Sequence, residues 1–143
     1  MELIPMSDHV PRIAVIDTDP VLLKELEDRI ESHGWVACAT SDWSHAAGFV
    51  ARAQADLVIF DIGQKGERAA AWHALDALKH AAETGEIPVI VCAAVTAVLR
   101  RDAGTLQQYG VEVLSKPCRP RRVLRKVEAV LRRRRTRRGW HRR

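Results

Sequence analysis

Two aspartates and one lysine stand where three short apolar runs of the chain end. Asp17 closes the run 12–17, Asp61 closes the run 56–61, and Lys116 comes just past a third run. If these runs are parallel strands, their carboxyl ends meet at one edge of a sheet, which is where ligands bind in open α/β folds. The spacing therefore predicts one small acidic site with a lysine beside it, and this site is the best indication of function.

The segment after the first run carries the signals of a helix that begins at once. Asp19 suits the N-cap position, and Pro20 suits the first helical position. Apolar residues follow at helical spacing as far as Ile30, and Gly34 ends the helix. The first two elements are thus predicted to be a buried strand and an amphipathic helix.

Strand and helix signals alternate in the same way along the rest of the chain. The predicted strands are 13–17, 35–39, 57–61, 87–92 and 111–114. The predicted helices are 20–33, 44–52, 68–83, 95–109 and 121–135. Such alternation favours a parallel sheet covered on both faces, and right-handed crossovers restrict it to a doubly wound topology. The expected fold class is α/β, with a doubly wound, five-stranded parallel sheet.

The composition is that of a globular protein with one domain. The chain has 143 residues, and 47% of them are apolar. No stretch reaches the roughly 18 to 20 apolar residues that are needed to span a bilayer. The first residues show neither a basic leader nor the apolar core of a signal peptide. We therefore expect no membrane span and a cytoplasmic location.

The three cysteines, Cys38, Cys92 and Cys118, are odd in number and widely spaced. Without a CxxC pair they indicate neither a disulfide framework nor a zinc site. Cys38 and Cys92 fall in apolar runs, where cysteine serves as a buried filler. Cys118 directly follows Lys116 and Pro117, so a reactive thiol and a filler are both open, and the filler is favoured.

The net charge of +5 conceals an acidic body and a basic end. Residues 119–143 carry a net charge of +12, and the other 118 residues carry −7. Possible anion-binding residues are Arg132, Arg133, Arg134, Arg135, Arg137 and Arg138. Clustered arginines bind nucleic acid or acidic proteins, including the acidic face of a second copy, which would give a homodimer. The alternative is a solvated helix end, although complementing the helix dipole accounts for only two or three arginines.

Several pieces of the chain, taken in order, resemble the receiver domains of two-component response regulators in layout and spacing. These pieces are 16–20, 56–61, 87–91 and 115–117. The resemblance covers residues 12–134, between an N-terminal extension (1–11) and an arginine-rich tail (135–143). It implies a flavodoxin-like (βα)5 fold.

In that family an aspartate after the third strand accepts a phosphoryl group from a histidine kinase or a phosphotransfer protein. The resemblance assigns this role to Asp61, with Lys116 as its partner and as the ligand of a phosphoryl oxygen. It also implies a Mg²⁺ site in which Asp17, Asp61 and the backbone carbonyl of Gly63 supply oxygen ligands. Asp19 is a further candidate ligand, although the cap of the helix is its more natural role.

Three positions depart from the family pattern. Thr18 stands where the family has a second acid, which weakens the expected metal site. Ala93 replaces the hydroxyl residue that ends the fourth strand, and Val113 replaces an aromatic residue three positions before the lysine. Both halves of the family's usual switch are therefore altered, so any signal has to use another route.

We expect a single-domain response regulator receiver that signals by protein–protein contact with a downstream partner. One alternative is a docking module of the same fold that works without phosphorylation. Another is a nucleic-acid-binding protein that acts through its tail. A conventional enzyme is not expected, because the chain has no phosphate-binding glycine loop and no nucleophile with a paired base.

Overall fold

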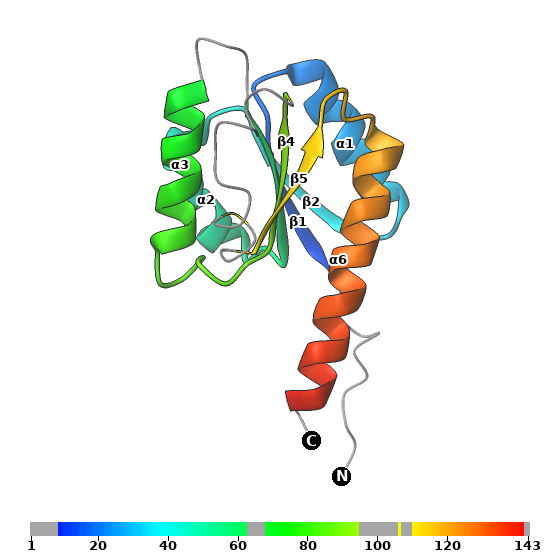
Figure 1. Ribbon diagram of the computed structural model, residues 1–143. Coiled ribbons are helices and arrows are strands. Elements are labelled where there is room, and N and C mark those ends of the chain that lie inside the picture. The colour runs from blue at the N-terminus through cyan, green and yellow to red at the C-terminus, as the bar shows by residue number, and fades with distance from the viewer. Residues whose placement is uncertain (1–8, 63–67, 95–105, 107–109, 142–143) are drawn as a thin grey trace.

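The computed structural model describes residues 9–62, 68–94, 106 and 110–141, and their strands form one parallel sheet (Figure 1). The strands are β1 (Arg12–Ile16), β2 (Val36–Thr40), β3 (Leu57–Asp61), β4 (Val89–Ala93) and β5 (Val111–Ser115). Their order is β2-β1-β3-β4-β5, and every neighbouring pair is parallel. This arrangement confirms the predicted five-stranded, doubly wound α/β sheet.

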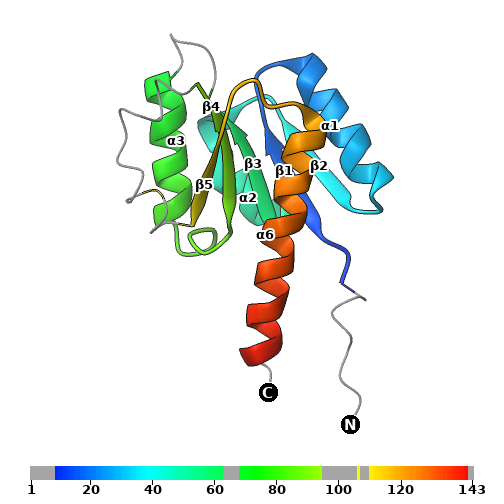
Figure 2. The ribbon, with the colours of Figure 1, turned by 45° about the vertical axis from the view of Figure 1, so that its right-hand side comes forward.

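Helices cover both faces of the sheet (Figures 1 and 2). One face is covered by α1 (Pro20–Ser32) and α6 (Pro120–His141). The other is covered by the short 3₁₀ turn η2 (Trp43–His45), α2 (Ala46–Ala53) and α3 (Arg68–His80). All five residues of β3 and all five of β4 are buried, because a strand covered on both faces has no side open to water.

Alternation along the strands divides the core into two layers. Leu57 and Ile59 of β3 pack with α1 and α6, whereas Val58 and Phe60 pack with α2 and α3. Because side chains alternate between the two faces along a strand, Asp61 lies on the same face as Leu57 and Ile59, at the end of β3. The buried pattern of β3 thus determines which face of the sheet receives the carboxylate.

The start of α1 forms as the sequence predicts. The Asp19 carboxylate accepts hydrogen bonds from the backbone N–H groups of Val21 at 3.0 Å and Leu22 at 3.4 Å. Pro20 occupies the first turn, where its missing N–H costs nothing. After α1 ends, Gly34 adopts a φ of +82°, in the left-handed region that suits glycine.

The helix predicted over 44–52 is observed as the 3₁₀ turn η2 followed by α2, and two further predicted helices end at other residues than expected. The helix predicted over 68–83 ends at His80, and the Thr84 hydroxyl donates to the Leu78 carbonyl at 2.6 Å in the turn that follows. The helix predicted over 121–135 continues to His141, since arginine is a strong helix former and the single Gly139 costs only about 1 kcal/mol. The helix predicted over 95–109 lies outside the described residues, except for Leu106, which is buried.

The last turns of α6 run past the end of the sheet in both views (Figures 1 and 2). Within the part of the chain that the structure describes, no helix is both long enough and apolar enough to cross a bilayer.

Candidate functional site

The two aspartates predicted to form the site lie on adjacent central strands. Asp17 directly follows β1, and Asp61 is the last residue of β3, whose Phe60 is in register with Ile16 of β1. β1 lies between β2 and β3, so this is the point where the strand order reverses and where doubly wound folds bind ligands. Both carboxylates are buried, with 2% of Asp17 and 6% of Asp61 exposed.

Lys116 reaches Asp61 from the far side of β4. Its ammonium lies 2.8 Å from Asp61 Oδ1 and donates a hydrogen bond to the Ile62 carbonyl at 3.2 Å. Asp61 Oδ1 is buried and accepts no hydrogen bond from the described residues, so its contact with Lys116 is an ion pair. The backbone N–H of Lys116 donates to the Ala93 carbonyl at 2.9 Å, which fixes the lysine at the end of β4.

The charges of the site are not balanced. One Asp17 oxygen accepts the backbone N–H of Asp19 at 2.9 Å. Burial, with the nearby negative charge of Asp61, nevertheless raises the pKa of Asp17 to about 7. Two buried carboxylates therefore face a single ammonium, and this excess of negative charge favours a cation.

Among the described residues, two of the implied oxygen ligands, Asp17 and Asp61, have their carboxylates at the site. Asp19 uses its carboxylate to cap α1, which confirms the helix-cap interpretation, and Gly63 lies outside the described residues. Among the residues with described positions, no three His, Cys, Asp or Glu side chains group closely enough to hold a metal ion. Asp17 and Asp61 remain, and Mg²⁺ is commonly bound by one or two carboxylates together with water and phosphate. The residues present thus fit a Mg²⁺ ion that is held by few protein ligands.

An open cavity of about 750 Å³ lies over the carboxyl ends of the strands, with room for a phosphoryl group. Its lining includes Thr18, Asp61, Lys116 and Cys118. A smaller cavity of about 370 Å³ lies between α1 and α6, and none of the predicted acidic-site residues lines it. The larger cavity is therefore the candidate site.

The two altered switch positions lie together on the α2/α3 face of the sheet. Ala93 is fully buried, and Val113 packs against the same apolar cluster from β5. Val91 and Val113 are in register on neighbouring strands, and Ala93 is two residues along from Val91. No hydroxyl group and no aromatic ring is present at either position, in agreement with the sequence.

The structure also brings two thiols to the site, Cys118, which the sequence placed beside Lys116, and Cys92, which the sequence analysis did not place there. Cys92 is in register with Asp61 and, as predicted, is buried with 4% exposed. Cys118 is 8% exposed and belongs to the same apolar cluster. The prediction that Cys38 is buried was wrong: it is only partly buried, because β2 is an edge strand of the sheet. The position of Cys92 in its strand could have predicted this, because the alternation of side chains places the thiol on the same face of the sheet as Asp61.

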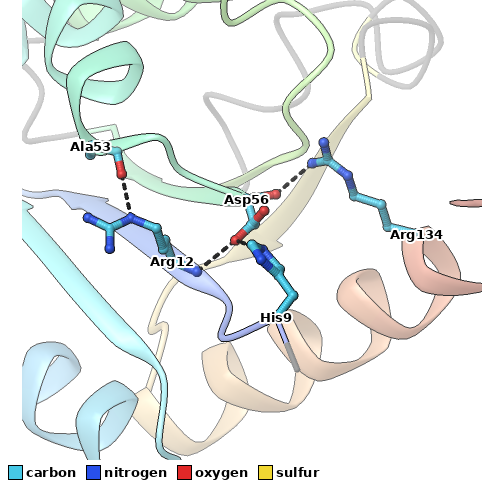
Figure 3. Close-up of polar contacts among 5 residues, drawn as sticks. All are labelled: His9, Arg12, Ala53, Asp56 and Arg134. Atoms are coloured by element: carbon cyan, nitrogen blue, oxygen red, sulfur yellow. Dashed lines mark hydrogen bonds and ion pairs between the residues drawn. The ribbon is translucent and has the colours of Figure 1, made fainter. Parts of the chain in front are cut away.

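The predicted anion-binding arginines lie far from the acidic site, at the amino ends of the strands. Figure 3 shows Arg134 donating to the Asp56 carbonyl at 2.6 Å. The Asp56 carboxylate lies 2.9 Å from Nε2 of the His9 ring and accepts a hydrogen bond from the backbone N–H of Arg12 at 2.8 Å. The Arg12 side chain donates through Nε to the Ala53 carbonyl at 2.7 Å. The contact from Arg134 holds α6 against the edge of the sheet opposite to Asp61.

The other arginines of this group differ in their surroundings. Arg133 pairs with Glu112 of β5 at 2.6 Å, and Arg132 is exposed. Arg135, Arg137 and Arg138 lie on the helical continuation of α6. The six arginines are therefore divided between contacts with the body of the domain and the end of the helix.

Comparisons with known proteins agree with this architecture. No family model matches the chain. The Transcriptional regulatory protein BaeR of Escherichia coli O6:H1 is 23% identical over 133 residues, which cover 93% of this chain and 53% of that protein. The chain thus spans about half the length of the curated relative that it matches.

Solved structures of response regulators superpose over most of the chain. Chemotaxis response regulator CheY4 of Vibrio cholerae gives a TM-score of 0.70 at 15% identity, covering 85% of this chain and 99% of that one. A response regulator from Desulfuromonas acetoxidans gives 0.64 at 20% identity, covering 85% and 97%. The resemblance seen in the sequence is thereby confirmed for the fold: this chain has the CheY-like fold of response regulator receiver domains.

Proposed function

We propose that the protein is a response regulator receiver in a two-component phosphorelay and that Asp61 accepts the phosphoryl group. The observation that carries the proposal is the 2.8 Å contact of Lys116 with Asp61, beside the buried Asp17 and in an open cavity at the switch point of the sheet. The partner on the donor side is a histidine kinase or a phosphotransfer protein. The output is contact with a downstream protein.

The side chains of the site suit this chemistry. An oxygen of the Asp61 carboxylate attacks the phosphorus, the bond from phosphorus to the donor's imidazole nitrogen breaks, and the imidazole leaves. The product is an acyl phosphate on Asp61. Lys116 then binds a phosphoryl oxygen with the ammonium that pairs with Asp61 at rest. The open cavity that Asp61 and Lys116 line admits the donor.

Asp17 and Asp61 are the residues that would hold Mg²⁺, with Gly63 as the proposed backbone ligand. The ion supplies positive charge that neutralises the phosphoryl oxygens. Thr18 in place of a second acid leaves few ligands, so we expect the affinity for Mg²⁺ to be low.

Incubation with acetyl phosphate and Mg²⁺ should add one phosphoryl group to the wild-type chain, as measured by intact-mass spectrometry. Because an acyl phosphate forms, hydroxylamine should remove the adduct. Asp61→Ala should take up none. Asp28→Asn, which changes an exposed aspartate on α1, is the matched control and should be phosphorylated like the wild type.

A folded wild-type protein that takes up no phosphoryl group would contradict the proposal. It would favour the phosphorylation-independent docking module. The departures from the family pattern at Thr18, Ala93 and Val113 favour the same alternative. An adduct that persists in Asp61→Ala would place the acceptor elsewhere.

A second candidate function is the binding of a polyanion by the end of α6. The helix continues to His141, seven residues beyond Arg134, the residue that contacts the edge of the sheet. At 1.5 Å per residue this extends it by roughly 10 Å. Arg135, Arg137 and Arg138 fall on this extension, at the end of the molecule opposite to the acidic site. Nucleic acid is the proposed ligand, bound through its phosphates without reading of the bases.

Replacing Arg135, Arg137 and Arg138 with Gln should weaken binding to a fluorescent DNA duplex and lower the slope of log affinity against log salt by up to about three. Changing three arginines elsewhere, Arg52, Arg119 and Arg121, to Gln is the control for net charge and should affect the slope less. Equal losses in the two variants would exclude a specific role for the α6 extension. Salt-sensitive association of the protein with itself, seen without DNA, would instead favour the acidic face of a second copy as the ligand.

A further inference from the structure

Cys92 lies directly beside the proposed phosphoacceptor. It is the Cα partner of Asp61 on one side and of Leu114 on the other. Its carbonyl accepts the backbone N–H of Ile62 at 2.9 Å, so the end of β4 is held tightly between its neighbours. The side chain faces the α1/α6 layer with Ile90, two residues earlier on the same strand.

Cys118 approaches the same place from the segment after β5. Its sulfur lies 3.5 Å from the Leu114 carbonyl and 3.7 Å from the Ser115 carbonyl. Since Leu114 is in register with Cys92 and its carbonyl contacts the Cys118 sulfur, the two cysteines pack in one apolar cluster. Two thiols that are far apart in the sequence thus form a pair below the acidic site.

The pair has one protected member and one that can be reached. Cys118 lines the 750 Å³ cavity with Asp61 and Lys116, whereas Cys92 does not. The hydrogen bond from Cys92, together with the charge of Arg122, lowers the pKa of Cys118, and Arg122 is held in place by its 2.9 Å bond to the Ser115 carbonyl. This is the arrangement of an attacking thiol with a resolving thiol behind it.

We propose that Cys92 and Cys118 are a redox-active pair that a hydroperoxide converts into a disulfide beside the acidic site. The Cys118 thiolate attacks the terminal peroxide oxygen, the O–O bond breaks, and the remaining oxygen leaves as an alcohol or as water after taking up a proton. The sulfur of Cys92 then attacks the Cys118 sulfenic acid, the S–O bond breaks, and hydroxide leaves with the Cys92 proton as water. Two thiols lose two electrons and two protons, and the peroxide gains both.

Cys38 provides an internal control. It is in register with Ala14, which belongs to the core layer of α2 and α3, so it lies on the opposite face of the sheet from Cys92. Its sulfur contacts Arg12 Nη2 at 3.8 Å. It is also more exposed than the other two thiols, so a reagent that only followed exposure would modify Cys38 first.

The test treats the full native chain with hydrogen peroxide, then denatures it, blocks the remaining thiols with iodoacetamide and measures the intact mass. Untreated protein should take up three blocking groups. Oxidised protein should take up one, on Cys38, and lose the mass of two hydrogen atoms, and dithiothreitol should restore all three. Peptide mapping without reduction should show a Cys92–Cys118 link. Cys38→Ser should form the same link, and Cys92→Ser should leave a sulfenic acid on Cys118 that dimedone traps.

Three outcomes would overturn the proposal. In the first, all three thiols are still blocked by iodoacetamide after peroxide treatment, so no cysteine was oxidised. In the second, only Cys38 is oxidised. In the third, Cys118 of the wild type gains oxygen but forms no disulfide with Cys92. The readout counts thiols and involves no phosphoryl transfer, so it gives an answer whether or not Asp61 is phosphorylated.

Discussion

Lys116→Met should lower the free energy of unfolding by about 2 kcal/mol at pH 8, since it leaves Asp61 buried without its counter-ion and next to a second carboxylate. Removing one partner of a fully buried pair costs roughly 3 to 5 kcal/mol. The smaller value is expected because 37% of the Lys116 side chain is exposed and water screens the contact. Urea denaturation followed by circular dichroism measures the effect.

The charge origin of that loss can be separated from packing by a double-mutant cycle. In an Asp61→Asn background the buried charge is absent, so Lys116→Met should cost much less, with a coupling energy of at least about 1 kcal/mol. Additive losses would mean that Lys116 stabilises the fold through its bond to the Ile62 carbonyl and through packing, rather than through Asp61.

Asp17→Asn should raise the free energy of unfolding at pH 8 by on the order of 2 kcal/mol and remove a pH dependence of stability. Asn keeps an oxygen for the Asp19 N–H but removes the charge. The pKa of Asp17 is about 7 in the folded protein, above its ordinary value of 3.8, so the folded state binds more protons than the unfolded state between these values. Wild-type stability should therefore fall as the pH rises from about 4 to about 7. Denaturation curves at pH 4, 6 and 8 measure this slope.

Added Mg²⁺ should reverse the difference in stability between the wild type and Asp17→Asn. A cation that binds only the folded state stabilises it, and Asp17 is a proposed ligand, so added Mg²⁺ should raise the melting temperature of the wild type but not of Asp17→Asn. The exposed Asp28→Asn variant should behave like the wild type in both experiments. A pH slope that persists in Asp17→Asn would assign the titration to another group, and equal Mg²⁺ effects would remove Asp17 from the metal site.

Much of the fold was predictable, because local rules and tertiary packing agree here. β3 was predicted as 57–61 and observed there, since a strand buried on both faces reads as a continuous apolar run. The start of α1 was predictable because Asp19 and Pro20 act locally at a helix terminus. The extent of α6 was less predictable, since helix ends depend on small differences in propensity and on contacts such as the one from Arg134 to the Asp56 carbonyl.

By itself, the sequence determined the alternation of elements, and hence that Asp17, Asp61 and Lys116 meet at one edge of a parallel sheet. Only the tertiary structure decided which atoms touch there. Lys116 reaches across β4 to Asp61, the Asp19 carboxylate caps α1, and Cys92 and Cys118 pack in one apolar cluster. The physical reason is that periodicity assigns a residue to a face and an end, whereas side-chain contacts between strands depend on register and on the path of the loops, which no local pattern encodes.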